Sequence, residues 1–222
     1  VGSEMCIRDR DVTVRGAISI GRRLQDPLAE LVKIDPKAIG VGQYQHDVTP
    51  KKLEESLAGV VEDSVNTVGV DLNIATPSLL THISGINAAI AKNIVDYREE
   101  AGHFTSRKEL LKVKRLGQKA YEQCAGFLRV AESKEPLDNT SVHPESYDAA
   151  KKLIGVLGYD NEALKNNKLG DIDEKAECYG ISKLSKELEI GEMTLKDIIK
   201  ELKKPGRDPR EEMPKPILKT GI

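Results

Sequence analysis

The sequence repeats itself once, about 30 positions apart, and this repeat limits the possible folds more than any other feature. Three apolar positions recur in the second copy: Leu80 as Leu110, Ile83 as Val113, and Ile86 as Leu116. A period in this range marks a repeated supersecondary unit. Two helix–turn–helix units related by a pseudo-twofold axis bury such apolar faces against each other. We therefore expect an all-α module built from two hairpins.

Helix signals follow both turns of the repeat. The pattern predicts one helix from about Asn87 to Ala101 and another from about Gln118 to Phe127. Between them, Ser106 and Glu109 form a capping box that predicts a further short helix.

Upstream of the repeat, Val14–Gln25 shows helical spacing, whereas residues 35–47 are rich in glycine and turn formers and indicate a loop. Thr49 and Pro50 then predict the start of a long helix. One stripe of that helix is expected to face a core: Leu53, Leu57, Val60, Val61, Ser64 and Val68.

Downstream of Val130 the chain is polar, and a helix is expected from about Pro144 to Leu157, stopped by Gly158. Further short helices are expected over 181–190 and 194–204, the second opened by a capping box of Thr194 and Asp197. No segment shows a strong alternating strand pattern. The predicted fold class is all-α: a tandem hairpin module and a second small helical domain, with loop-rich extensions at both ends.

Composition narrows the class of protein. The 222 residues carry a net charge of −2, with 32% charged and only 4% aromatic residues, which suits small helical modules with thin cores. The three cysteines, Cys6, Cys124 and Cys178, lie too far apart for a disulfide framework or a zinc site. No apolar run reaches membrane-spanning length. We expect a cytoplasmic protein that has no membrane contact.

The two turns resemble the hairpin of helix-hairpin-helix proteins, which reads hydrophobic-x-Gly-hydrophobic-Gly. Such glycines let the backbone approach a phosphate closely, and the amides that open the next helix favour an anion. Each turn here keeps one glycine, since Asn87 replaces the second glycine of the first turn and Arg115 the first glycine of the second. Asn87 is expected either to adopt the left-handed conformation or to cap its helix.

Charge around the turns supports phosphate binding. From Thr81 to Val130 there are nine basic and five acidic residues, a local net charge of +4, and four of the cations flank the second turn. The second turn is therefore predicted to be the better phosphate site. The predicted nucleic-acid-binding residues are Gly85, Ile86, Asn87, Lys92, Lys114, Arg115, Leu116, Gly117, Gln118 and Lys119. A glycine turn between helices can also be a simple connection, and similar modules serve only as packing units.

Other chemistries have little support. His46 and Asp47 are adjacent and point apart, and no phosphate-binding P-loop motif is present. The histidines are too scattered for a metal site. Tyr97 and Tyr121 lie at core-like helical positions and are interpreted as packing residues. We expect no enzyme activity, no metal and no cofactor.

The stretch from Val68 to Val130 resembles the tandem helix-hairpin-helix module shared by competence-type DNA-binding proteins and the Tex family of bacterial transcription accessory proteins. The flanking phrases "RRLQDPLAELVKIDPKAIGVGQYQHDV", "PLDNTSVHPESY" and "KKPGRDPR" favour Tex. The resemblance covers nearly everything from Asp11 to Leu218.

The resemblance implies a domain organisation. Residues 11–48 would end an RNase H-like domain, 49–132 would form the tandem module, 133–204 a degenerate hairpin-type domain, and 205–222 a proline-rich linker to an OB-fold domain. Residues 1–10 fit nothing downstream, and we interpret them as a translated sequencing adaptor or engineered scar. The chain is accordingly interpreted as a piece of a longer protein.

Two functions of different classes follow. The first is a nucleic-acid-binding module without sequence preference, which contacts DNA or RNA phosphates in a transcription accessory protein, with the transcription machinery as a further partner. The second is a structural and protein-interaction scaffold that joins the RNase H-like and OB-fold domains without touching nucleic acid. Exposure of the two turns would favour the first function, and their burial the second.

Overall fold

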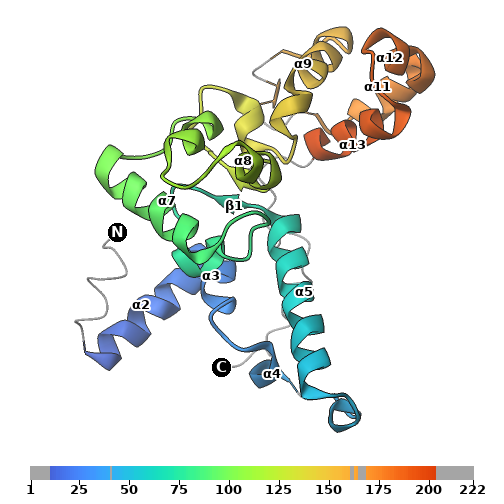
Figure 1. Cartoon of the computed structure of the whole chain (residues 1–222). Helices are drawn as coiled ribbons and strands as arrows, with labels where there is room; N and C mark the ends of the chain where they lie inside the picture. Colours follow the sequence, from blue (N-terminus) through green and yellow to red (C-terminus); the bar gives the residue numbers. More distant parts are fainter. Residues whose placement is uncertain (1–10, 41, 161–162, 165–168, 204–222) are drawn as a thin grey trace, which may run out of the picture.

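The computed structural model describes residues 11–40, 42–160, 163–164 and 169–203, and the predicted all-α fold is confirmed (Figure 1). The interpretations of residues 1–10 and 205–222 lie outside the described residues. The helices are α2 (Val12–Gln25), α3 (Pro27–Leu31), α4 (Pro36–Ile39), α5 (Pro50–Val68), α6 (Pro77–Leu80), α7 (Ala88–Ala101), α8 (Gln118–Cys124), α9 (Tyr147–Val156), α11 (Ile172–Tyr179), α12 (Ile181–Glu187) and α13 (Glu192–Lys203). Short 3₁₀ turns are η1 (Gln45–Asp47), η2 (Arg107–Lys112), η3 (Pro136–Asn139) and η4 (Pro144–Ser146).

Local sequence explains several helix starts. Proline occupies the first position of α3, α4, α5 and α6, where its missing amide costs no hydrogen bond. Asp26 and Thr76 cap α3 and α6 by accepting from the amides of Ala29 and Leu79. The predicted loop over 35–47 is partly wrong, because α4 and η1 each form one turn there.

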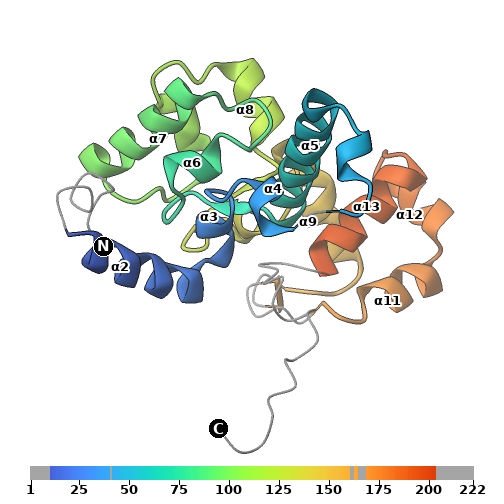
Figure 2. The ribbon, with the colours of Figure 1, turned by 90° about the horizontal axis from the view of Figure 1, so that it is seen from below.

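Two separate apolar cores organise these helices. Figure 2 shows α6–α8 on one side of the molecule and α11–α13 on the other. The first core runs from Ala29 to Val130 and contains both sets of repeated apolar residues. Ile83 and Val113 are 2% and 3% exposed, and Ile86 and Leu116 are 5% and 4% exposed. The two hairpins therefore pack against each other as the repeat predicts.

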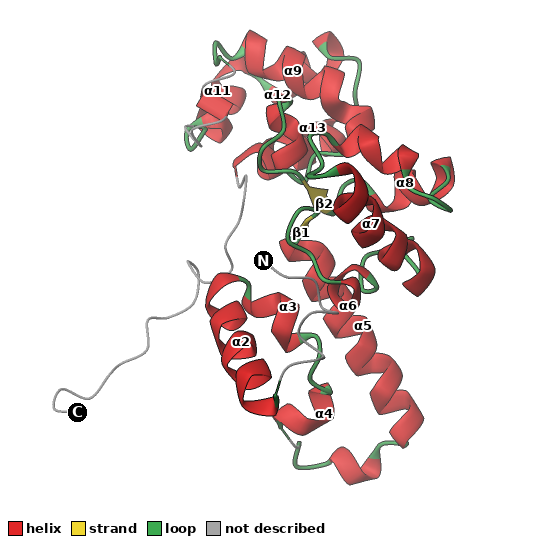
Figure 3. Cartoon of the chain, turned by 90° about the vertical axis from the view of Figure 1, so that its left-hand side faces the viewer, coloured by secondary structure: helices red, strands yellow, loops and turns green. Residues whose placement is uncertain are grey.

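Two short parallel strands, β1 (Val70–Asp71) and β2 (Leu128–Arg129), close this module at its two ends (Figure 3). The amide of Val70 donates to the carbonyl of Phe127 and that of Leu72 to Arg129. The sequence shows no strong alternating strand pattern, and this short pairing is compatible with the all-α class. A two-residue strand is too short to leave an alternating pattern in the sequence.

Helix α5 extends away from the first core, which corrects the predicted buried stripe. Among the described residues of α5 only Val65 is fully buried. Val60 is 61% exposed, and Ser64 is also exposed, its hydroxyl donating to the Val60 carbonyl. Leu53, Leu57, Val61 and Val68 are only half-buried. The stripe is apolar, but within the described residues only the end of α5 meets the hairpins.

The second core spans Leu137 to Leu202 and holds a repeat that the sequence did not reveal. The amides of Leu157 and Leu188 donate to the carbonyls of Leu153 and Leu184, at 3.0 and 2.9 Å. Those of Tyr159 and Ile190 donate to Ile154 and Ser185, at 3.0 and 3.1 Å. Every member of these pairs is 31 positions from its counterpart, as 188 is from 157. The second unit is thus also a pair of related hairpins.

The expected helix boundaries need two corrections, one in each unit. The capping box of Thr194 and Asp197 is wrong, because α13 already begins at Glu192 and both residues lie inside it. In the first unit, α8 ends at Cys124 instead of Phe127. The predicted capping box of Ser106 and Glu109 is half right. Ser106 caps the Lys108 amide, whereas Glu109 accepts from Thr105.

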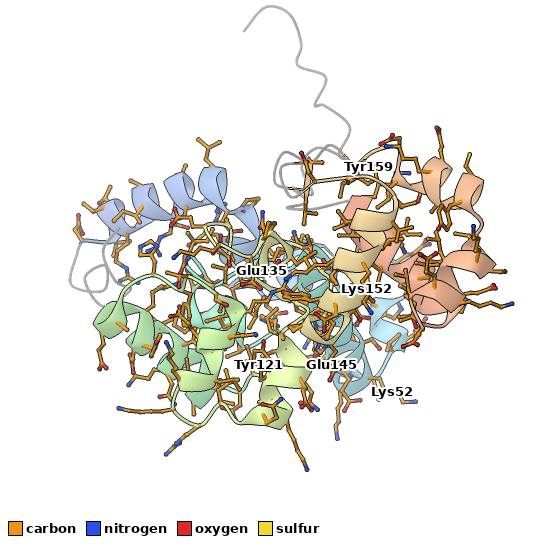
Figure 4. The ribbon with its side chains drawn as sticks, turned by 90° about the horizontal axis from the view of Figure 1, so that it is seen from above. Lys52, Tyr121, Glu135, Glu145, Lys152 and Tyr159 are labelled. Atoms are coloured by element: carbon orange, nitrogen blue, oxygen red, sulfur yellow. The ribbon has the colours of Figure 1, made fainter. Side chains whose placement is uncertain are left out.

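A buried arginine joins the two units. Arg107 is 0% exposed, and its guanidinium donates to the carbonyls of Leu128 at 2.6 Å, Val142 at 2.7 Å, and Thr140. It also donates to the Tyr147 hydroxyl at 2.8 Å. Nearby, His143 bonds the Glu122 carbonyl, and Figure 4 shows Tyr121 of α8 and Glu145 of η4 at this junction.

Candidate nucleic-acid interface

The two predicted turns share one backbone path. The amide of Ile86 donates to the carbonyl of Ile83 at 3.0 Å, and that of Leu116 to Val113 at 3.2 Å. The middle residue of each turn has a positive φ, +81° at Gly85 and +67° at Arg115. Glycine adopts this region freely, whereas an L-residue is strained there by roughly 1–2 kcal/mol.

Packing explains why one turn has glycine and the other arginine at this position. A Cβ atom on Gly85 would lie 2.8 Å from the Gln123 Cβ and 3.2 Å from the Ala120 carbonyl oxygen of α8. The first turn is therefore pressed against the second hairpin and has no room for a side chain. Arg115 carries a Cβ at the equivalent place and extends its side chain to the surface.

The cap positions differ in a way that affects anion binding. Asn87 has φ −92° and ψ 171°, and Gly117 has φ −84° and ψ 174°. The left-handed conformation expected for Asn87 is therefore wrong, and its capping role is confirmed. The Asn87 side chain accepts from the Ile90 amide at 2.9 Å, which places a carboxamide oxygen where an anion would bind. Among the described residues, no side chain caps the first turn of α8.

Neighbouring amide side chains hold both turns, and these residues were not among the predicted site residues. Asn93 of α7 donates to the Lys114 carbonyl at 2.7 Å, and Asn66 of α5 accepts from the Ser84 amide at 3.3 Å. Gln123, which packs on Gly85, lies 30 positions after Asn93. The offset that relates the turns therefore also relates these two residues, and it could have identified them.

The structure leaves four predicted cations exposed near the turns: Lys92, Lys114, Arg115 and Lys119. None of their side chains forms an ion pair with another residue that the structure describes. At the positions matching Lys114, Arg115 and Lys119, the first hairpin has Ser84, Gly85 and Ala89. Positive charge therefore gathers at the second turn.

Not every basic residue counted from the sequence belongs to this surface. Arg107 and Arg129 are 0% and 7% exposed, and half-buried Arg98 donates to the carbonyls of Leu72 and Ala75. Lys112 pairs with Glu109 at 3.2 Å. A hydrogen bond from the Thr105 amide lowers the pKa of that Glu109 carboxyl. The patch is smaller than the count of nine suggests.

The remaining predicted site residues divide into surface and core. Gly85, Asn87, Gly117 and Gln118 are exposed, whereas Ile86 and Leu116 point into the first core, so only their backbone could meet a ligand. The side-chain carboxamide of Gln118 donates to the Glu122 carboxylate at 2.9 Å along α8.

The packing interpretation of the two tyrosines is confirmed. Tyr121 is 7% exposed, and the Tyr97 ring stacks on Phe104 with 5.1 Å between centroids. Within the described ranges, no group of three His, Cys, Asp or Glu residues could hold a metal ion. The helices of those ranges include none that is both long and apolar enough to cross a membrane.

Comparison with known proteins gives the family. A family model described as the helix-hairpin-helix motif matches residues 65–129, and one described as the HHH domain matches 135–210. The transcriptional accessory protein Tex of Neisseria gonorrhoeae is 54% identical over 211 residues, which are 94% of this chain and 27% of that protein. The chain belongs to the Tex family.

Two further relatives span the same segment. Protein tex of Bordetella pertussis is 50% identical over 221 residues, or 96% of this chain and 26% of that protein. The uncharacterized protein YdcI of Bacillus subtilis (strain 168) is 55% identical over 214 residues, or 96% of this chain and 29% of that protein. The chain thus spans under a third of the length of these relatives.

Proposed function

We propose that this segment binds DNA or RNA without sequence preference, through the second hairpin. The observation that carries the proposal is the contrast between the two caps. Asn87 fills the opening of α7 with its own carboxamide, whereas Gly117 leaves the first amides of α8 without a side-chain partner in the described part of the chain. Exposed Lys114, Arg115 and Lys119 surround these amides. Amides and cations together favour phosphate oxygens, which carry no base identity.

The exposure of the turns supports contact with a large ligand. The apolar residues Ile86 and Leu116 anchor the turns in the core. The exposed residues around them are Gly85 and Asn87 in the first turn and Arg115, Gly117, Gln118 and Lys119 in the second. Asn93, which holds the Lys114 carbonyl, keeps the second turn in one conformation. A preformed site loses less conformational entropy when it binds.

The family gives this binding a context. One relative is named a transcriptional accessory protein, and we propose that this segment supplies nucleic-acid contacts in such a protein, with the transcription machinery as a partner. In the same proposal, residues 11–48 end an RNase H-like domain, 49–132 form the binding module, 133–204 form the second helical domain, and 205–222 lead to an OB-fold domain.

The test is a fluorescence-anisotropy titration of a labelled mixed-sequence duplex at two salt concentrations that differ fourfold. If about three phosphates are contacted, the higher salt weakens binding by roughly 40-fold. Lys119→Gln should remove one contact and reduce that loss to roughly 12-fold. Lys108→Gln is the matched control, since Lys108 is also exposed but lies on η2 before the turn. Equal effects of the two variants would contradict the assignment of the site.

The scaffold function remains a second proposal because of the buried junction. The guanidinium of Arg107 ties the start of the second hairpin to the segment from Thr140 to Tyr147. Such a junction suits a rigid connector. A segment that shows no salt-dependent binding to duplex or single strands would favour this function over the first.

A further inference from the structure

The second helical unit contains a hairpin built like the proposed binding turn. Glu189, with φ +55°, precedes Ile190 and Gly191, and α13 begins at the next residue. In the second hairpin, Arg115 with φ +67° precedes Leu116 and Gly117, and α8 begins next. The left-handed residue, the apolar residue and the glycine before the helix thus follow in the same order.

The first and third hairpins form the other matched pair. Gly158, with φ +75°, precedes Tyr159 and Asp160, and the Asp160 side chain accepts from the Ala163 amide at 2.7 Å. Asn87 accepts from the Ile90 amide in the same way, at 2.9 Å. Asn87 and Asp160 thus make the same side-chain bond to the amide three residues later, and in both units the later hairpin has glycine before its helix.

The second hairpin, before α8, and the fourth, before α13, differ in charge. The second turn carries Lys114 and Arg115, whereas exposed Glu189 and Glu192 lie at the fourth turn. The carboxylate of Glu192 accepts from the Ser182 hydroxyl at 2.6 Å, and that of Glu187 from the Tyr179 hydroxyl at 2.9 Å. Three carboxylates thus lie on or beside the fourth turn, which shares with the second turn the left-handed residue, the apolar residue and the glycine before the helix.

We propose that Glu189 excludes nucleic acid from the fourth hairpin and so confines binding to the first unit. The residue in the left-handed position decides which hairpin faces phosphate: Arg115 attracts it and Glu189 repels it. Arg115 and Glu189 both have a positive φ, +67° and +55°, so a charge exchange at either position keeps a non-glycine residue in the left-handed region. This inference rests on the proposed function, because it explains why nucleic acid would bind the second hairpin and not the fourth.

The test uses Glu189→Arg in the full chain, in the same duplex titration. A new phosphate contact should strengthen binding about eightfold at 0.1 M salt. It should also raise the loss of affinity on a fourfold increase in salt from roughly 40-fold to roughly 150-fold. Glu177→Arg is the matched control, since it makes the same charge change at an exposed position on α11, away from any hairpin turn. It should leave the salt dependence near that of the wild type.

The outcomes separate the two proposals. A wild-type chain that fails to bind overturns the proposed function and this inference with it. A wild type that binds, with Glu189→Arg unchanged or no stronger than Glu177→Arg, overturns this inference alone. The mirror variant Arg115→Glu should weaken binding by at least eightfold, and thermal melting should show both variants folded like the wild type.

Discussion

Placing asparagine at Gly117 should make the protein more stable and a weaker binder at the same time. The backbone at Gly117 differs from that at Asn87 by 8° in φ and 3° in ψ, and a Cβ there meets nothing within 4 Å. Gly117→Asn should therefore adopt the cap that Asn87 already makes. Its carboxamide would accept from the Ala120 amide and occupy the place proposed for a phosphate oxygen.

Both magnitudes follow from this geometry. A better cap adds a few tenths of a kcal/mol, and loss of glycine freedom in the unfolded chain adds roughly 0.4–1 kcal/mol. The melting temperature should rise by about 2 °C. A displaced hydrogen bond to a charged phosphate is worth at least about 1.5 kcal/mol, so affinity should fall about tenfold. The salt dependence should stay constant, because no cation is removed.

The assay pairs thermal melting by circular dichroism with the duplex titration. Asn87→Gly is the control, because it opens the first cap and should lower stability slightly while leaving affinity at or above the wild-type level. If Gly117→Asn melts higher but binds as tightly as the wild type, the amides of the second turn do not contact phosphate. If it melts lower, the equivalence of the two caps is mistaken.

Further predictions concern the fold itself. Gly85→Ala should cost about 2 kcal/mol or more in urea denaturation, because it adds left-handed strain and a Cβ close to α8, whereas Arg115→Gly should be neutral or slightly stabilising; equal costs would contradict the packing argument. Arg107→Met should cost about 3–5 kcal/mol in the same assay, because it leaves several buried acceptors unpaired, and a loss below 1 kcal/mol would be inconsistent with the buried network. The pKa of Glu109 is lower in the folded chain than its ordinary 4.5, so its contribution to stability is complete above that pH and is lost as the pH falls through the lower folded value. Glu109→Gln should therefore lose less stability than the wild type when acid unfolding is followed from pH 5 downward. If the free energy of unfolding falls equally with pH in both proteins, the Thr105 hydrogen bond contributes nothing.

The candidate site could be predicted only where its determinants are local. The 30-residue repeat located both turns, and the cation count favoured the second. The same count included Arg107, because nothing in the residues near it in sequence shows that carbonyls from 128 to 142 will enclose it. The predicted burial of the α5 stripe was wrong for the same reason, because an apolar face is buried only where another element covers it.

The sequence by itself determined most of the helices and the first repeat. Proline starts, caps and apolar spacing act within one or two turns of chain, so they can be recognised without knowing the fold. Tertiary structure alone decided which side chains are buried and which hairpins are equivalent. The 31-residue repeat survives in backbone hydrogen bonds while its side chains differ, as Ile154 and Ser185 do. Backbone amides and carbonyls bond alike whatever the side chain, so a shared fold can outlast a shared sequence.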